Sequence, residues 1–242
     1  MLQRTEGIVL KTNVFGEADL IVTHLTVDHG IIKTFARSPR KTKSRFGSSL
    51  EPLTCSKISF WGKEDAALPR LTQSDIIHSF ESIRGSLHCF LRASEIIELI
   101  LRLTPERESC GKIYSLLMGI LRSLEKECEP GLQLLYYKLK ILQVSGYLPK
   151  LDGCGRCGRK SDSFFIMHGT VLCGRCSGGN RTSFILSPVV VSLYTNLLGW
   201  NITKINRIKP SESQMKELSA LIDEHVRYVT ERSLRTKEFR VP

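Results

Sequence analysis

The sequence predicts an α+β protein of more than one domain, in which a small β-barrel or sandwich precedes a helical domain that carries an inserted four-cysteine element. Three observations predict this class. The first 80 residues contain short runs rich in β-branched and aromatic residues, which are typical of strands. From about residue 85 the apolar residues recur with the period of a helix. Four of the eight cysteines then lie close together between two helical stretches.

Turn signals divide the first 80 residues into five short strands. The clearest is the sequence Asp28-His29-Gly30, which predicts a tight hairpin. Five strands within about 80 residues indicate a small sandwich or barrel. Residues 37–47 are rich in Arg, Lys, Ser and Pro, so we expect an exposed loop there. The expected strands are Thr5–Lys11, Leu20–Leu25, Ile31–Ala36, Ser56–Phe60 and Leu68–Ser79.

Helical stripes of Leu and Ile follow, and helix-terminating residues separate them. The first stripe ends at Thr104-Pro105, the second at Glu129-Pro130 and the third at Gly146. After the cysteines, Ser187-Pro188 predicts a helix start and Ser211 with Gln214 predicts a capping box. We interpret the stripes as a shared helical core. The expected domains are 1–80 (barrel), 81–149 (helical domain, first part), 150–182 (zinc-ribbon-like insert) and 183–242 (helical domain, second part, with a basic tail).

The clustered cysteines predict a structural zinc site. Cys154 and Cys157 form one C-x2-C pair, and Cys173 and Cys176 form a second pair after fifteen residues. This spacing is that of zinc sites in which two tight turns direct four thiolates at one Zn²⁺. Because four cysteine ligands leave no open position for water, we expect the zinc to be structural rather than catalytic. Two disulfides or a redox C-x-x-C are the alternatives. The other four cysteines (Cys55, Cys89, Cys110 and Cys128) are expected to be buried free thiols.

The charge of the chain indicates an anionic partner. Its 242 residues include 35 Lys and Arg against 24 Asp and Glu, a net charge of +11, and nucleic acid is a common partner of such proteins. Residues 37–47 carry five cations and no anion. On a loop beside a barrel they are suited to phosphate contacts, and Phe46 to stacking on a base; a solvated loop is the alternative. The predicted DNA-binding residues are Arg37, Arg40, Lys41, Lys43, Arg45 and Phe46, with Arg156, Arg159, Lys160 and Arg175 as secondary candidates.

Known catalytic patterns are absent from the sequence. It has no phosphate-binding G-x-x-x-x-G-K-[ST] motif, no H-E-x-x-H and no G-x-S-x-G. Its six histidines are dispersed, and Asp19 and Asp28 lack clustered partners for nuclease chemistry. We therefore expect a binding protein rather than an enzyme. No apolar run is long enough to span a bilayer and the start shows no secretory signal pattern, so we expect a soluble cytoplasmic protein without membrane partners.

Several segments, in this order, resemble the bacterial recombination-repair family RecO. The order of the parts is similar as well: barrel, helices, cysteine element and basic tail. The resemblance covers nearly the whole chain, although the cysteines mark only a subgroup of that family. The similar segments are Glu6–Lys11, Phe15–Asp19, Gly30 with Ala36-Arg37, Lys43–Gly47, Leu50–Pro52 and Leu142–Pro149.

The resemblance implies an N-terminal OB-fold and a recombination mediator in DNA repair. Such proteins bind single- and double-stranded DNA and anneal complementary strands. With RecR they help to load RecA at gaps coated by single-stranded DNA-binding protein, whose acidic and hydrophobic C-terminal tail they recognise. The family's DNA-contacting barrel loop matches Arg37, Arg40, Lys41, Lys43 and Arg45, and its members work at the nucleoid. A zinc-ribbon OB-fold accessory factor of transcription or translation, and a metal-dependent nuclease, are the alternatives.

Overall fold

A computed structural model describes residues 1–40, 44–63, 66–128, 131–179 and 184–236. Two of the predicted DNA-binding residues, Lys41 and Lys43, lie outside the described residues. The chain folds as two units, Met1–Cys128 and Glu129–Pro242. The predicted fold class is confirmed, because a strand-rich segment is followed by helices and a small cysteine-bearing sheet. Among the described residues, every helix is too short or too polar to cross a membrane.

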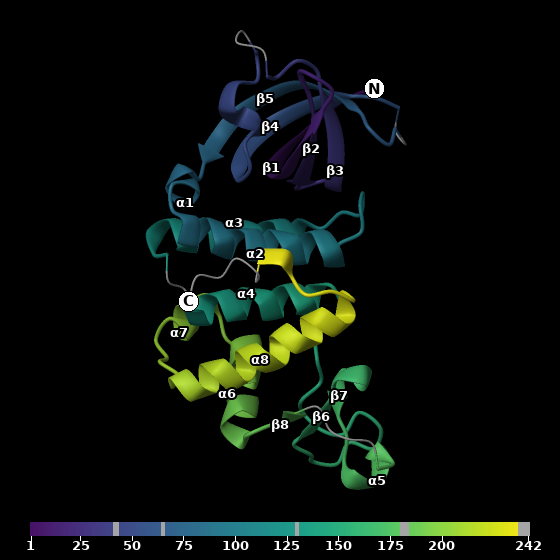
Figure 1. Ribbon diagram of the computed structural model, residues 1–242, viewed down its shortest axis with the longest axis vertical. Coiled ribbons are helices and arrows are strands. Elements are labelled where there is room, and N and C mark those ends of the chain that lie inside the picture. Colours follow the sequence, from purple (N-terminus) through teal and green to yellow (C-terminus); the bar gives the residue numbers. More distant parts are fainter. Residues whose placement is uncertain (41–43, 64–65, 129–130, 180–183, 237–242) are drawn as a thin grey trace. The chain divides into compact units, whose positions relative to one another are not determined.

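The N-terminal strands close into a barrel of OB type. Their order is β1-β2-β3-β5-β4, with β1 paired to both β2 and β4, and β3 running parallel to β5 at Phe35 and Arg70. Strand β1 serves two neighbours because a register shift between Val9 and Lys11 bends it. Figure 1 shows the curled strands. They are β1 (Leu2–Phe15), β2 (Asp19–Thr26), β3 (Gly30–Ala36), β4 (Thr54–Trp61) and β5 (Arg70–Ser79), with a 3-10 helix η1 (Gly47–Leu50) before β4.

Alternate residues of the strands fill the barrel interior. Period-two alternation sends one set of side chains inward, where η1 and the residue before it close one end. These interior residues are almost fully buried, and the row Ile8–Leu25–Ile31, which belongs to the opposite face of the strands, is buried too. The interior cluster consists of Val9, Val22, Ile32, Ala36, Phe46, Leu50, Ile58, Phe60 and Leu71.

Three helices follow the barrel, and the third packs on that outward-facing row. They are α1 (Glu81–Arg84), α2 (Leu87–Leu103) and α3 (Gly111–Lys126). Cys55, the register partner of Ile8 on β4, has its Sγ 3.4 Å from the Oη of Tyr114 on α3. The strands therefore have apolar residues on both faces where α3 covers them. As a result the packing boundary lies at Cys128, whereas the change from strands to helices lies near residue 80.

The connection between α2 and α3 packs directly on β3. Ile31 and Glu106 form a parallel bridge, and the N–H of Arg107 donates to the carbonyl of Ile31 at 3.0 Å. The guanidinium of Arg107 also donates to the carbonyl of Ala66, in the β4–β5 loop. Gly30 has φ +63° and lies so close that a Cβ atom would fall 1.9 Å from the carbonyl oxygen of Glu108. This connection, residues 104–110, is called the strap below.

The expectation of free thiols is wrong for two cysteines. Cys89, in the first turn of α2, forms a disulfide with Cys128, which follows α3, and their Cα atoms are 5.4 Å apart. That distance is usual for disulfides. The α2–α3 hairpin brings the start of one helix beside the end of the other, which the local sequence around either cysteine does not reveal. Cys55 is a buried free thiol, as expected, and Cys110 is a half-buried one.

The second unit packs α4 (Gly131–Val144), α6 (Pro188–Gly199), α7 (Ile202–Ile205) and α8 (Glu212–Val229) around one core. The predicted helix starts are confirmed: the Ser187 Oγ accepts from the N–H of Val190, and Ser211 forms a capping box with Gln214. Ser187 also donates from its N–H to Glu217 on α8 at 2.9 Å, which ties the start of α6 to α8.

The cysteine element lies between α4 and α6 in the chain. Its sheet has the order β7-β6-β8, and Gly169, with φ +60°, lies in the connection between β6 and β7. His225 of α8 donates through Nε2 to the carbonyl of Tyr147 at 2.8 Å, just before the element. Burial lowers the pKa of His225, so the ring is neutral and suited to this single bond. The parts are β6 (Ser163–Phe165), η2 (Ile166–His168), β7 (Thr170–Val171), α5 (Gly174–Ser177) and β8 (Phe184–Ile185).

Candidate metal centre and nucleic-acid interface

Four thiols converge in the cysteine element. The Sγ atoms of Cys154, Cys157, Cys173 and Cys176 all lie within 4.8 Å of one another, and those of Cys157 and Cys173 are 3.6 Å apart. A tetrahedral site with Zn–S bonds of about 2.3 Å requires sulfur atoms about 3.8 Å apart. The predicted ligand set is therefore brought together in a geometry that can hold a metal ion.

The backbone holds each cysteine pair in a tight turn. In the first pair the N–H of Gly158 donates to the carbonyl of Cys154 at 2.8 Å, and Gly158 has φ +74°, which favours glycine. In the second pair the N–H of Cys176 donates to the carbonyl of Cys173 at 2.9 Å. Short-range sequence therefore fixes each pair, and the β6–β7 hairpin brings the pairs together.

The pKa shifts of these thiols show that the four sulfur atoms interact strongly. Backbone N–H groups, first that of Cys173, lower the pKa of Cys154 to about 6. Hydrogen bonding with Cys157 and then Cys173 raises the pKa of Cys176 to about 12. So many sulfur atoms cannot all ionise without a compensating positive charge. A divalent metal would supply that charge, and four sulfur ligands would leave no open position on it for a substrate.

The predicted basic loop lies partly across the β1–β2 turn. Arg40 donates from Nη1 to the carbonyl of Glu17 at 3.0 Å, and the N–H of Ser38 donates to Asp19 Oδ1 at 2.6 Å. Arg37, Arg40 and Arg45 are all exposed. Residues 37–40 of the loop therefore present Arg37 and Arg40 at the barrel end that carries the β1–β2 turn.

Phe46 does not occupy the place expected for base stacking. It is 3% exposed and belongs to the interior cluster, with the guanidinium of Arg45 4.9 Å from its ring centroid. The residue before η1 closes the barrel, and an aromatic ring excludes water there better than any other part of this polar loop. Its expected role in base stacking is therefore corrected to a packing role.

The sequence pattern did not predict an exposed row on the barrel that contains aromatic residues. Trp61 is the register partner of Arg70, and Arg70 is in turn the partner of Phe35. Trp61 is 60% exposed and Phe15 is 52% exposed, and the rings of Phe15 and Phe35 meet edge to face at 5.9 Å between centroids. Large apolar residues in a strand are expected to be core. A local signal was that Phe35 lies two residues after the charged Lys33, on the same face of the strand.

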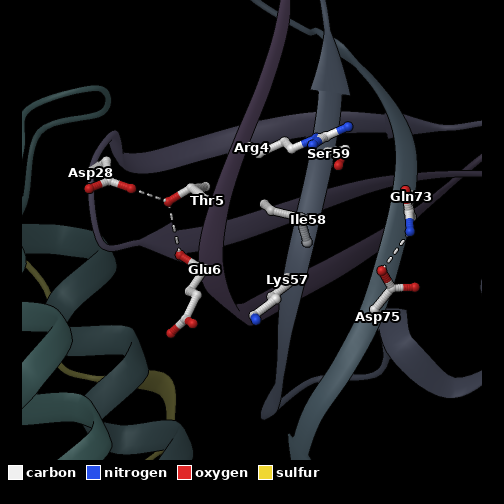
Figure 2. A pocket seen from close by; sticks show the side chains of 9 residues that line it. All are labelled: Arg4, Thr5, Glu6, Asp28, Lys57, Ile58, Ser59, Gln73 and Asp75. Atoms are coloured by element: carbon white, nitrogen blue, oxygen red, sulfur yellow. Dashed lines mark hydrogen bonds between the residues drawn. The ribbon is translucent and has the colours of Figure 1, made fainter.

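A polar groove of about 510 Å³ adjoins this row on β1, β4 and β5 (Figure 2). The strand register arranges its residues in two rows. Arg4, Ser59 and Gln73 form the row nearer Trp61. Glu6, Lys57 and Asp75 form the next row, with Asp28 beyond it accepting from the Thr5 hydroxyl at 2.7 Å. The groove therefore changes from cationic to mainly acidic along the strands.

The secondary candidates lie on the surface of the cysteine element. Arg156, Arg159, Lys160 and Arg175 are exposed. Arg156 donates from Nη1 to the carbonyl of Cys176 at 3.0 Å, so it also braces the second cysteine pair.

Comparison with known proteins gives consistent similarities over nearly the whole chain. The family model described as "Recombination protein O N terminal" matches residues 1–80, and "Recombination protein O C terminal" matches residues 85–238. A DNA repair protein RecO from Thermodesulfovibrio yellowstonii is 39% identical, with 92% of this chain and 91% of that protein covered. The same-named proteins of Dehalococcoides mccartyi and Bacillus pumilus are 31% and 28% identical, with 95% and 99% of this chain and 91% and 93% of those proteins covered.

Proposed function

This chain belongs to the RecO family of DNA repair proteins, and we propose that it is a recombination mediator that acts by binding and not as an enzyme. It binds single- and double-stranded DNA and anneals complementary strands. With RecR it helps to load RecA at gaps coated by single-stranded DNA-binding protein. The observation that carries this proposal is the loop between β3 and η1, where Arg37, Arg40 and Arg45 are exposed, with the exposed Phe15 on the neighbouring β1.

Annealing requires no covalent chemistry. Two DNA strands repel each other through their phosphates, and a cationic surface lowers that repulsion and raises the local concentration of both strands. The net charge of +11 supplies such a surface. The predicted Lys41 and Lys43 would add two cations to the same loop.

Recruitment to coated gaps would come from the C-terminal tail of single-stranded DNA-binding protein. A weak contact to this tail and a weak contact to DNA reinforce each other when both are made at once. The helical region would supply the tail site, with apolar side chains and a cation for the terminal carboxylate. The protein would bind and anneal DNA in the cytoplasm, at the nucleoid.

The metal of the cysteine element is proposed to be a structural Zn²⁺ held by Cys154, Cys157, Cys173 and Cys176. The sulfur distances and the shifted thiol pKa values support it. The ion would hold in shape a segment whose own core contains little beyond Phe165 and Leu172.

A strand-annealing assay tests the function. Complementary fluorescent oligonucleotides are mixed with the protein without ATP, bare or coated with single-stranded DNA-binding protein that has or lacks its C-terminal tail. We expect faster pairing on bare strands, and on coated strands only when the tail is present. No acceleration on any substrate would refute the proposal and favour an accessory factor of transcription or translation.

A charge-reversal variant tests the loop residues through the salt dependence of single-strand binding affinity. Changing Arg37, Arg40 and Arg45 to Glu removes up to three phosphate contacts, so we expect the salt slope for single strands to fall by about 2. Changing Lys204, Arg207 and Lys209, exposed cations of the second unit, to Glu alters the net charge equally and serves as the control. An equal loss of DNA-binding affinity in both variants would show that the effect comes from the overall charge and not from the loop.

A further inference from the structure

A row of residues that includes Trp61 and Phe35 crosses the outside of the barrel from β1 through β4, β5 and β3 to β2. Its register partners are Leu2 and Trp61, Trp61 and Arg70, Arg70 and Phe35, and Phe35 and Ile21. Because register partners point to the same face, these side chains form one line across five strands. The ring of Phe15 contacts the ring of Phe35 edge to face, near the β2 end of the line. Apart from half-buried Phe35 and Ile21 the row is exposed, which is costly in water unless a partner covers it.

The spacing of the row suits an unpaired strand and not a duplex. Trp61 and Phe35 are separated by β5, so their backbones are about 10 Å apart, two strand spacings. Bases in a duplex are stacked about 3.4 Å apart and leave no room for a protein ring. An unpaired strand can turn its bases outward and stack them on aromatic side chains, whatever the sequence.

The charges around the row agree with a nucleic-acid occupant. Arg70 lies in the row between Trp61 and Phe35, and Lys63 and Arg37 are exposed near it in the chain. The groove in Figure 2 begins beside the row with Arg4. Farther along the strands it contains the carboxylates of Glu6 and Asp75. Phosphates are attracted to the first part and repelled by the second, so the path of a strand is bounded by the Glu6–Lys57–Asp75 row.

We propose that this row is a base-stacking platform, on which Trp61 and the Phe15–Phe35 pair receive unpaired bases while Arg70 contacts the intervening phosphate. The inference rests on the proposed DNA binding and adds to it a reason for distinguishing single strands from duplexes. The cations of the loop bind phosphates of either form, whereas the rings bind only exposed bases.

Tryptophan fluorescence tests the proposal directly, because Trp61 and Trp200 are the two tryptophans of the chain. In a Trp200→Phe background the emission reports Trp61 alone. We expect strong quenching on addition of oligo-dT and little on addition of a duplex of equal length. Fluorescence anisotropy of labelled DNA gives the affinities in parallel.

Trp61→Ala is expected to weaken single-strand binding about 5- to 150-fold, the range for loss of one stacked base. The salt slope and the duplex affinity should stay as in the wild type, because no phosphate contact is lost. Trp61→Phe should recover part of the affinity. Ile76→Ala, which removes an apolar residue of β5 that is 47% exposed, is the matched control and should have no effect.

The outcomes separate this inference from the proposed function. Unchanged single-strand affinity in Trp61→Ala, without quenching in the Trp200→Phe protein, would overturn the stacking platform and leave DNA binding intact. Equal weakening of single strands and duplexes would also overturn it. Absence of any DNA binding by the wild type would refute the proposed function itself.

Discussion

At the scale of single residues, Gly30 shows how one position connects the barrel to the helices. Two glycines of the barrel have nearly the same backbone, Gly30 with φ +63° and Gly16 with φ +64°, but only Gly30 is crowded by the strap. Gly30→Ala should therefore lose more stability than the roughly 1–2 kcal/mol expected from a left-handed alanine alone. Gly16→Ala should lose only that amount.

Urea denaturation in the Trp200→Phe background measures this difference, since Trp61 then reports on the barrel. The two variants share the backbone strain, so their difference isolates the contact with Glu108. Equal destabilisation of both would show that the strap moves away from Gly30 at little cost.

His24 makes the barrel sensitive to acid. It is fully buried, burial lowers its pKa to about 4, and among the described residues its Nε2 has no hydrogen-bond partner. Below about pH 6.5 the unfolded chain binds a proton at this histidine, whereas the folded protein does not bind it until the pH nears 4. The free energy of unfolding therefore keeps the whole contribution of neutral His24 above about pH 6.5 and loses it as the pH drops toward 4.

From pH 7 to pH 5 this group should cost about 2 kcal/mol of the free energy of unfolding. His24→Leu should lose that part of the pH dependence, whereas His88→Gln, at an exposed histidine, should keep it. The free energy of unfolding at several pH values, obtained from urea titrations, checks this. Parallel pH profiles for wild type and His24→Leu would contradict it.

At the scale of elements, we expect the cysteine-rich insert to depend on the proposed Zn²⁺ and the barrel to be independent of it. Cys157→Ser should reduce the zinc content from about one per chain to far less and loosen residues 150–179, because the cluster around the cysteines contains only Phe165 and Leu172 besides them. Plasma mass spectrometry for zinc and hydrogen exchange of the insert measure both effects. Cys110→Ser, at a half-buried cysteine outside the cluster, is the control; equal zinc loss there would count against the four-sulfur site.

At the scale of the whole molecule, the first unit is larger than its barrel. Strand residues Ile8, Leu25 and Ile31 are buried outside the barrel interior, and the strap supplies backbone partners to β3. A fragment of residues 1–128 should therefore unfold cooperatively, whereas residues 1–80 should expose this apolar row and aggregate or remain loosely folded. Urea unfolding of the two fragments distinguishes these cases, and a cooperative 1–80 fragment would show that the helices are dispensable.

The sequence by itself determined the type and order of the elements and the set of four cysteines that cluster. Strand and helix periods, the caps at Ser187 and Ser211, and the two C-x2-C pairs depend on residues a few positions apart, so local physical chemistry is enough to predict them.

Only the tertiary structure decided which apolar side chains are covered. Ile8 and Trp61 both lie on outward-facing positions of strands, yet one is buried beneath helices and the other is exposed. The burial of Phe46, the Cys89–Cys128 disulfide and the approach of Glu108 to Gly30 have the same origin. Each depends on segments far apart in the chain, which no local pattern records and which packing alone brings together.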